Sequence, residues 1–204
     1  YSIEEFALAL ESFMNVKELP AAHFCAFGEA AAYVLDFVMH NVNRAGRLVF
    51  ISPMLTGSGN GAIKAKGLPS ILGMTAGKML SENTVRGVLE DCYFDRTLVT
   101  DEVAKEYAMG LMERDFKVIA KMCVGNFIDD EIKQNIHSVK NPMLIIVGAE
   151  DKITGGQKSE FLQYPFAAAS SLTVRNCGFF VNEEKPDKVN EAVVEFCKPG
   201  KQGK

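Results

Sequence analysis

The stretch "HFCAFGEAAAYVLDF", residues 23–37, restricts the possible folds of this chain more than any other. A short apolar run ends at Gly28, and a run of helix-forming residues begins directly after the turn. This pattern predicts a buried strand, a sharp turn and a helix, which together are a building unit of folds with parallel strands.

The alternation of strand and helix continues along the chain. Apolar runs predict further strands at 46–53, 142–150 and 171–178, and amphipathic patterns predict helices from Ser2 to about Pro20, at 30–42 and at 185–197. The run at 142–150 is apolar throughout, as in strands covered on both faces. The chain is therefore predicted to be an α/β protein with a parallel sheet.

Between residues 53 and 141 the strand signal disappears. Helical periodicity predicts helices there at about 82–92, 101–112, 114–123 and 128–136. A helical segment between two consecutive strands is typical of a lid or cap. We predict a core of residues 1–53 and 142–198, a helical cap at 54–141 and a disordered tail at 199–204.

Composition excludes several classes of function. The net charge of −4 argues against a nucleic-acid partner, and no apolar run is long enough to span a membrane. Five cysteines without metal-ligand spacing indicate reduced thiols, and so an intracellular, reducing compartment such as the cytoplasm or the mitochondrial matrix. No metal or cofactor is predicted, since "GSGNGAIK" at 57–64 matches neither common phosphate-binding motif.

The turn after the first apolar run has the outline of a nucleophile elbow. In such turns a nucleophile between small residues occupies a strained position. If Gly28 is the first small residue, the nucleophile position falls on Ala30 and the closing glycine position on Ala32, with Glu29 next to the tip. The turn then keeps the small residues that packing needs and lacks a reactive atom.

Over nearly its whole length the chain resembles the α/β-hydrolase fold, of which it would form the C-terminal half of the sheet. "NPMLIIVGAEDKIT" is similar to the strand and turn that present the catalytic acid, which would be Asp151. "SLTVRNCGFF" is similar to the last strand and the turn of the catalytic histidine, whose position is taken by Phe179. The resemblance thus implies a degenerate triad at Ala30, Asp151 and Phe179. It implies a candidate pocket made of Gly28, Glu29, Ala30, Ala32, Asp151 and Phe179.

Within this fold the chain most resembles the N-myc downstream-regulated (NDR) family, which keeps the scaffold and lacks a working triad. The resemblance rests on "YSIEEFALAL", on "AAAYVL" after the turn and on Cys177-Gly178. Glu29 and the segment "FVNEEKPDKVNEAVVEF" depart from that family's pattern.

These observations predict a protein that is not an enzyme. Without a hydroxyl and a base, no acyl intermediate can form. The leading hypothesis is a non-catalytic structural or protein-interaction subunit of a larger assembly. The alternative is a hydrolase-derived enzyme or small-ligand binder that uses the pocket under the cap without a serine triad. A ligand binder needs an open cavity there, whereas in a scaffold Phe179 and Phe180 can fill it.

Two of the candidate residues also have plainer interpretations. Asp151 can be a turn-forming residue after a strand, and Glu29 a helix-capping carboxylate. Cys25 and Cys177 are expected to be small buried residues.

The resemblance makes the first strand an edge. Strand 23–28 is apolar, and a bare apolar edge favours aggregation. We expect a protein partner or a missing N-terminal segment to lie against it. The chain begins with Tyr1 and lacks the basic start of a signal peptide, which leaves a processed start and a fragment of a longer chain both open.

Overall fold

A parallel four-stranded sheet forms the centre of the computed structural model, which describes residues 2–55, 81–112, 130–158, 160–164 and 166–198. The strands are β1 (Ala22–Phe27), β2 (Ala45–Ile51), β3 (Met143–Gly148) and β4 (Ala169–Val174), in the order β1-β2-β3-β4. All three pairings are parallel, which confirms the predicted sheet.

Helices precede, connect and follow the strands. They are α1 (Ile3–Val16), α2 (Ala30–His40), α4 (Glu82–Cys92), α5 (Asp101–Met112), α7 (Asp130–Asn135), α8 (Val181–Glu184) and α9 (Pro186–Cys197). Short 3₁₀ turns occur at η1 (Val42–Arg44), η2 (Arg96–Leu98), η3 (Ile136–Ser138), η4 (Gly156–Lys158) and η5 (Glu160–Gln163).

The two central strands are covered on both faces, as their continuous apolar sequences require. In β2, Leu48 and Phe50 pack in the cluster with α1 and α2, whereas Val49 and Ile51 pack in the cluster with α9. The same alternation runs through β3. This division follows from the two-residue period of a strand, which sends successive side chains to opposite faces.

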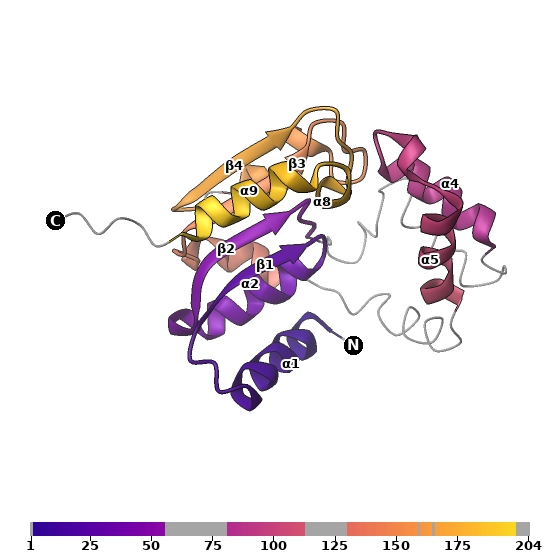
Figure 1. Ribbon diagram of the computed structural model, residues 1–204. Coiled ribbons are helices and arrows are strands. Elements are labelled where there is room, and N and C mark those ends of the chain that lie inside the picture. The colour runs from indigo at the N-terminus through magenta and orange to yellow at the C-terminus, as the bar shows by residue number, and fades with distance from the viewer. Residues whose placement is uncertain (1, 56–80, 113–129, 159, 165, 199–204) are drawn as a thin grey trace.

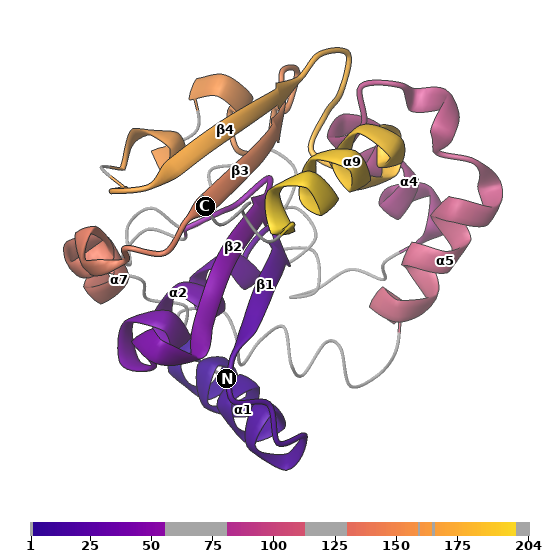
Figure 2. The ribbon, with the colours of Figure 1, turned by 60° about the vertical axis from the view of Figure 1, so that its left-hand side comes forward.

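The α4–α5 pair lies at the carboxyl edge of the sheet. In Figure 1 the strand arrows point towards this pair, and α9 lies on the sheet face opposite α1 and α2. Figure 2 shows from another side that α4 and α5 lie beside the sheet and not on either of its faces. Helix α4 begins where predicted because the Ser81 hydroxyl accepts a hydrogen bond from the Thr84 N–H at 3.3 Å.

Helix α7 and the turn η3, within the segment 54–141, pack against the sheet. Ile132 of α7 and Ile136 of η3 are buried in the cluster formed by the sheet, α1 and α2. The predicted helix at 114–123 and the start of that at 128–136 lie outside the described residues.

Strand β4 begins and ends earlier than predicted. The predicted range of 171–178 included a turn, in which Asn176 has a left-handed φ of 53° and Cys177 N–H donates to the Glu150 carboxylate at 2.9 Å. The backbone therefore leaves the sheet after Val174.

Strand β1 forms one edge of the described sheet. Cys25, expected to be buried, is exposed: its neighbours Phe24 and Ala26 pack in the cluster with α1 and α2, so Cys25 points to the opposite face of the sheet. Large apolar side chains are also exposed on the neighbouring helix α1 and just after it: Leu8, Phe13, Val16 and Leu19. Among the described helices, none is both long and apolar enough to cross a membrane.

Candidate functional site

The turn between β1 and α2 has its left-handed residue at Gly28. Gly28 has a φ of 58°, Glu29 already has helical angles, and Ala30 is the first residue of α2. Of the residues in this turn, Gly28 is thus the one with a left-handed backbone, and Ala30 and Ala32 belong to the helix. Gly28 N–H donates to the Ile51 carbonyl at 3.0 Å, and the Gly28 carbonyl accepts from Met54 N–H at 3.1 Å, so β2 and its continuation hold the turn.

Phe179 faces this tip from the turn after β4. A Cβ atom built on Gly28 would lie 3.7 Å from Phe179 Cζ, and apart from Phe27 and Glu29, its neighbours in the chain, no other described residue would have an atom within 4 Å. The Phe179 backbone is held by Ser52, whose hydroxyl donates to the Phe179 carbonyl at 2.7 Å. Ser52 is buried and left-handed, with a φ of 43°. Sequence reasoning missed it, although a serine between a buried strand and Pro53 was a visible signal.

Asp151 lies in the turn after β3 and is 5% exposed. Its carboxylate accepts hydrogen bonds from Ile153 N–H at 2.7 Å, from Thr154 N–H at 3.1 Å and from the Thr154 hydroxyl. Burial raises the pKa of Asp151, and the hydrogen bonds from Thr154 and Ile153 oppose that shift. All the bonds to its oxygens come from its own turn, which fits the turn-forming interpretation.

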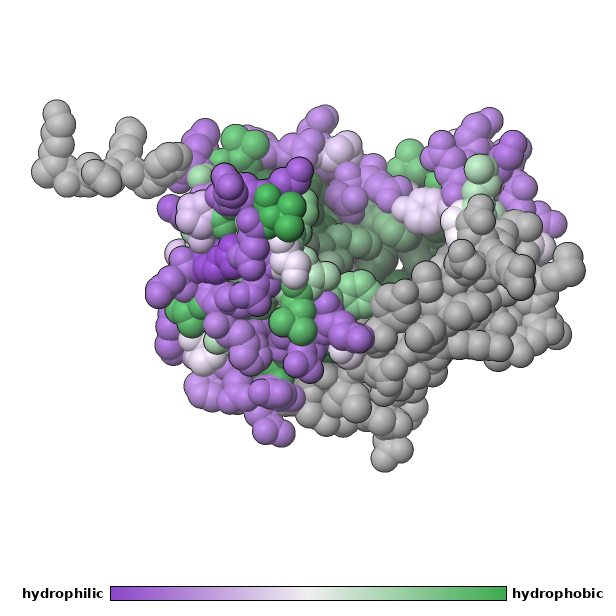
Figure 3. All heavy atoms as spheres, turned by 90° about the horizontal axis from the view of Figure 1, so that it is seen from below, coloured by the Kyte–Doolittle hydropathy of each residue, from purple (hydrophilic) through white to green (hydrophobic). Residues whose placement is uncertain are grey.

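Aromatic side chains from the core and from the α4–α5 pair meet above the tip. The Phe27 ring lies 4.9 Å from that of Phe179, and the Phe180 ring lies 5.1 Å from that of Tyr93 and 5.7 Å from that of Tyr107. Ile153, beside the Asp151 turn, packs against the same cluster. Figure 3 shows a hollow lined by hydrophobic residues between the core and the part that carries α4 and α5.

Two glutamates of α8 connect the core to this aromatic wall. Glu183 accepts hydrogen bonds from the hydroxyls of Tyr93 and Tyr107. Burial is the main cause that raises the pKa of both tyrosines, and the hydrogen bonds to Glu183 raise it further. Sequence reasoning missed Glu183 because these tyrosines lie 90 and 76 residues away along the chain.

Glu184 is buried and bonds to backbone groups. One carboxylate oxygen accepts from Phe94 N–H and Asp95 N–H, both at 3.0 Å, and the other accepts from Gly178 N–H at 2.6 Å. It thereby ties the end of α4 to the turn that carries Phe179.

Glu29 is the candidate residue whose carboxyl has no hydrogen bond or ion pair to any described residue. It is half-buried, and this burial alone raises the pKa of its carboxyl. Within the described ranges, the N–H groups of Glu29 and Ala30 also donate no hydrogen bond, as expected at the start of a helix.

The chain's three histidines lie away from this site. His23 is in β1 near its start, His40 ends α2 and His137 lies in η3, all towards the amino ends of the strands. The described residues contain no group of three or more histidine, cysteine or acidic side chains arranged to hold a metal ion.

Solved structures share this fold. A meta-cleavage product hydrolase from Pseudomonas fluorescens IP01 aligns with a TM-score of 0.78 and 22% identity over 96% of this chain and 71% of its own. A serine hydrolase from the polyaromatic hydrocarbon-degrading bacterium Cycloclasticus zankles aligns with a TM-score of 0.80 and 15% identity, over 95% of this chain and 70% of its own. The carboxylesterase CesB from Bacillus subtilis aligns with a TM-score of 0.73 and 17% identity, over 96% of this chain and 66% of its own. No protein-family model and no curated sequence matches the chain.

These likenesses establish the α/β-hydrolase fold. They also contradict the prediction that the chain is not an enzyme, because the proteins that share its fold here are hydrolases and esterases. That prediction equated the loss of serine and histidine with the loss of all catalytic chemistry. The resemblance to the NDR family stays a prediction.

Proposed function

We propose that the protein is a hydrolase-derived enzyme that binds a small, largely apolar ester beneath α4 and α5 and works without a serine triad. The observation that carries this proposal is the convergence at Gly28. The ends of β1 and β2, the Asp151 turn, Phe179 and the α4–α5 pair all meet there in one apolar cluster. Ligand sites of open parallel sheets lie at this edge.

Glu29 is the residue proposed to act as a base. Its carboxylate would take a proton from a water molecule, whose oxygen attacks the ester carbonyl carbon. The bond to the alcohol oxygen then breaks, and the alcohol leaves with the proton that Glu29 returns. A raised pKa suits this role, because a base works best when its pKa lies near the working pH.

The start of α2 supports the charge that develops on the carbonyl oxygen. The N–H groups of Glu29 and Ala30 are free of other described partners and lie at the positive end of the helix dipole. Gly28 leaves room for the substrate and water, because a side chain there would occupy the space in front of Phe179.

Ester hydrolysis by the purified chain tests this proposal. We expect p-nitrophenyl acetate and butyrate to be turned over, and Glu29→Gln to lower the rate about 100-fold, as for loss of a general base. Glu106→Gln, on the exposed side of α5, is the matched control and should keep the wild-type rate. Absence of turnover by the wild-type chain, or equal rates in both variants, would overturn the proposal.

We propose narrower bounds for the cap than the sequence suggested. Packing of α4 and α5 around Tyr93 and Phe179, apart from the sheet clusters, supports assigning these two helices to it. Burial of Ile132 and Ile136 with the sheet supports assigning α7 and η3 to the core.

We also propose that further polypeptide covers β1, either a preceding segment of the same protein or another chain. The exposure of Cys25 at this edge supports it, as do the large apolar side chains exposed nearby on α1, of which Val16 is 80% exposed.

A further inference from the structure

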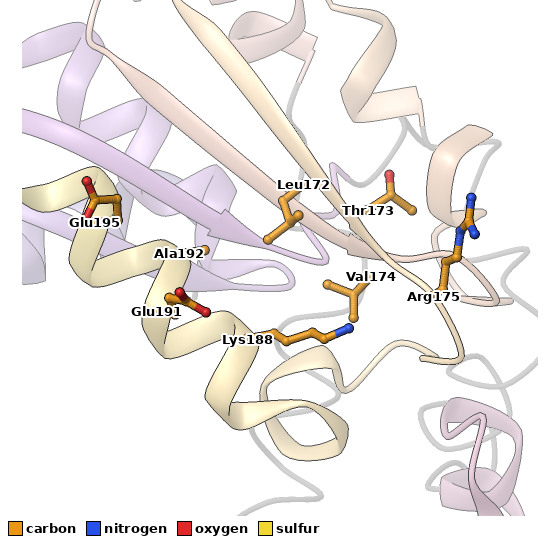
Figure 4. A pocket seen from close by; sticks show the side chains of 8 residues that line it. All are labelled: Leu172, Thr173, Val174, Arg175, Lys188, Glu191, Ala192 and Glu195. Atoms are coloured by element: carbon orange, nitrogen blue, oxygen red, sulfur yellow. The ribbon is translucent and has the colours of Figure 1, made fainter.

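A groove of about 670 Å³ runs along the opposite edge of the sheet, between β4 and α9. Figure 4 shows Leu172 and Val174 pointing from β4 towards α9, where Ala192 lies. The groove therefore has an apolar floor beside β4, at the opposite end of the strand order from β1.

The outer edge of β4 is open to pairing. The sheet order ends at β4, and in the described part of the chain no strand pairs with its outer side. Its sequence, "ASSLTV", contains neither proline nor charge, the devices that usually protect an edge strand. Its first three residues, 169–171, are exposed.

Charge is distributed unevenly along the groove. Arg175 follows β4, and Lys188 lies in the first turn of α9, so both basic groups are at one end. Glu191 and Glu195 follow along α9 towards the other end, because this helix runs back along the sheet. Within the described residues, neither Arg175 nor Lys188 forms an ion pair.

We propose that this groove is one half of a two-fold interface with a second copy of the chain. A two-fold axis perpendicular to β4 would pair the two β4 strands antiparallel and continue the sheet from one copy into the other. The same axis places the basic end of each groove opposite the acidic end of its partner. Opposite charges therefore face each other when the two β4 strands run antiparallel. If the two strands ran parallel, like charges would face each other.

Sedimentation equilibrium of the full chain tests the interface through a charge swap. We expect a dimer in the wild type. Lys188→Glu alone and Glu195→Lys alone should each raise the dimer dissociation constant about tenfold, because each puts like charges together twice in a two-fold interface. The double variant K188E/E195K should return to within about threefold of the wild type, since opposite charges face each other again.

The pair K105E and E106K, exposed on α5, is the matched control and should leave the dimer unchanged. Circular dichroism verifies that every variant is folded. A wild-type chain that stays monomeric at 200 µM overturns the proposal. So does a dimer that neither single substitution weakens, or one that the double variant fails to restore.

Discussion

Gly28 is the residue on which the nature of the site depends. Gly28 has a left-handed backbone, as the nucleophile of a hydrolase elbow has. It faces Phe179, which stands where the base of such a nucleophile would lie. We predict that Gly28→Ser combined with Phe179→His increases ester hydrolysis at least 100-fold over either single variant, because the hydroxyl gains a base within reach. The measurement is p-nitrophenyl butyrate turnover.

Ala30→Ser with Phe179→His is the matched control for this gain. The sequence interpretation placed the nucleophile at Ala30, whereas the structure places that residue inside the first turn of α2. The control should therefore stay at the level of Phe179→His alone. Equal gains in both double variants would contradict the assignment of the tip to Gly28.

Glu29 should also affect stability in a pH-dependent way. Burial raises the pKa of its carboxyl in the folded protein above the ordinary 4.5, so the folded state prefers the protonated form. This contribution is fully present below pH 4.5 and is lost as the pH rises through the folded pKa. Glu29→Gln stays neutral, so we expect its Tm to match the wild type at pH 4 and to exceed it by about 2 °C at pH 8.

Thermal unfolding followed by circular dichroism at both pH values measures this difference. Asp151, whose pKa is also raised, is present in both proteins, so its contribution cancels in the comparison. A Tm difference that is the same at pH 4 and pH 8 would show that the Glu29 carboxyl is not desolvated by folding.

Helix α8 is the element that joins the α4–α5 pair to the core. Glu184→Gln replaces an acceptor of three backbone N–H groups by an amide that turns a donor towards some of them. We expect a loss of about 2–3 kcal/mol in the free energy of unfolding, typical of a broken charged hydrogen-bond set. Hydrogen exchange should quicken in α4 and α5 more than in β2 and β3, and Glu106→Gln should change neither. Equal acceleration in the sheet would argue against a local connection.

The elements that sequence reasoning predicted well are those governed by local patterns. The continuous apolar run of β3 and the serine cap of α4 could be read directly, because burial on both faces and capping each depend on a few adjacent residues. The edge position of β1 could be predicted from the resemblance.

The features it missed depend on backbone angles or on distant partners. Whether Gly28 flanks the tip or forms it is decided by φ, which the letters "FGEA" do not encode. Glu183 and Glu184 contact Tyr93, Phe94 and Asp95, just after α4, and Tyr107 of α5, which lie 76 to 90 residues away along the chain. Val174 ends β4 because the next residues turn towards Glu150, a contact that β propensity does not reveal.

The whole molecule presents two sheet edges that should behave differently. Strand β1 has an exposed thiol at Cys25 and exposed apolar neighbours on α1, whereas β4 carries the self-complementary groove. In the isolated chain, we expect the outer amides of β1 to exchange with deuterium within minutes at every protein concentration, because no strand among the described residues pairs with them. The outer amides of β4 should become slower as concentration rises, since a second copy covers them.

Mass spectrometry of peptides from 22–27 and 169–174, at 1 µM and 100 µM protein, separates the two edges. The internal reference is peptide 143–148 of β3, which is paired on both sides and is expected to exchange slowly at both concentrations. Slow exchange of 22–27 at 1 µM would show that β1 needs no covering polypeptide. Concentration dependence confined to 22–27 would instead place the contact between copies at β1, where unpaired backbone and exposed apolar side chains coincide.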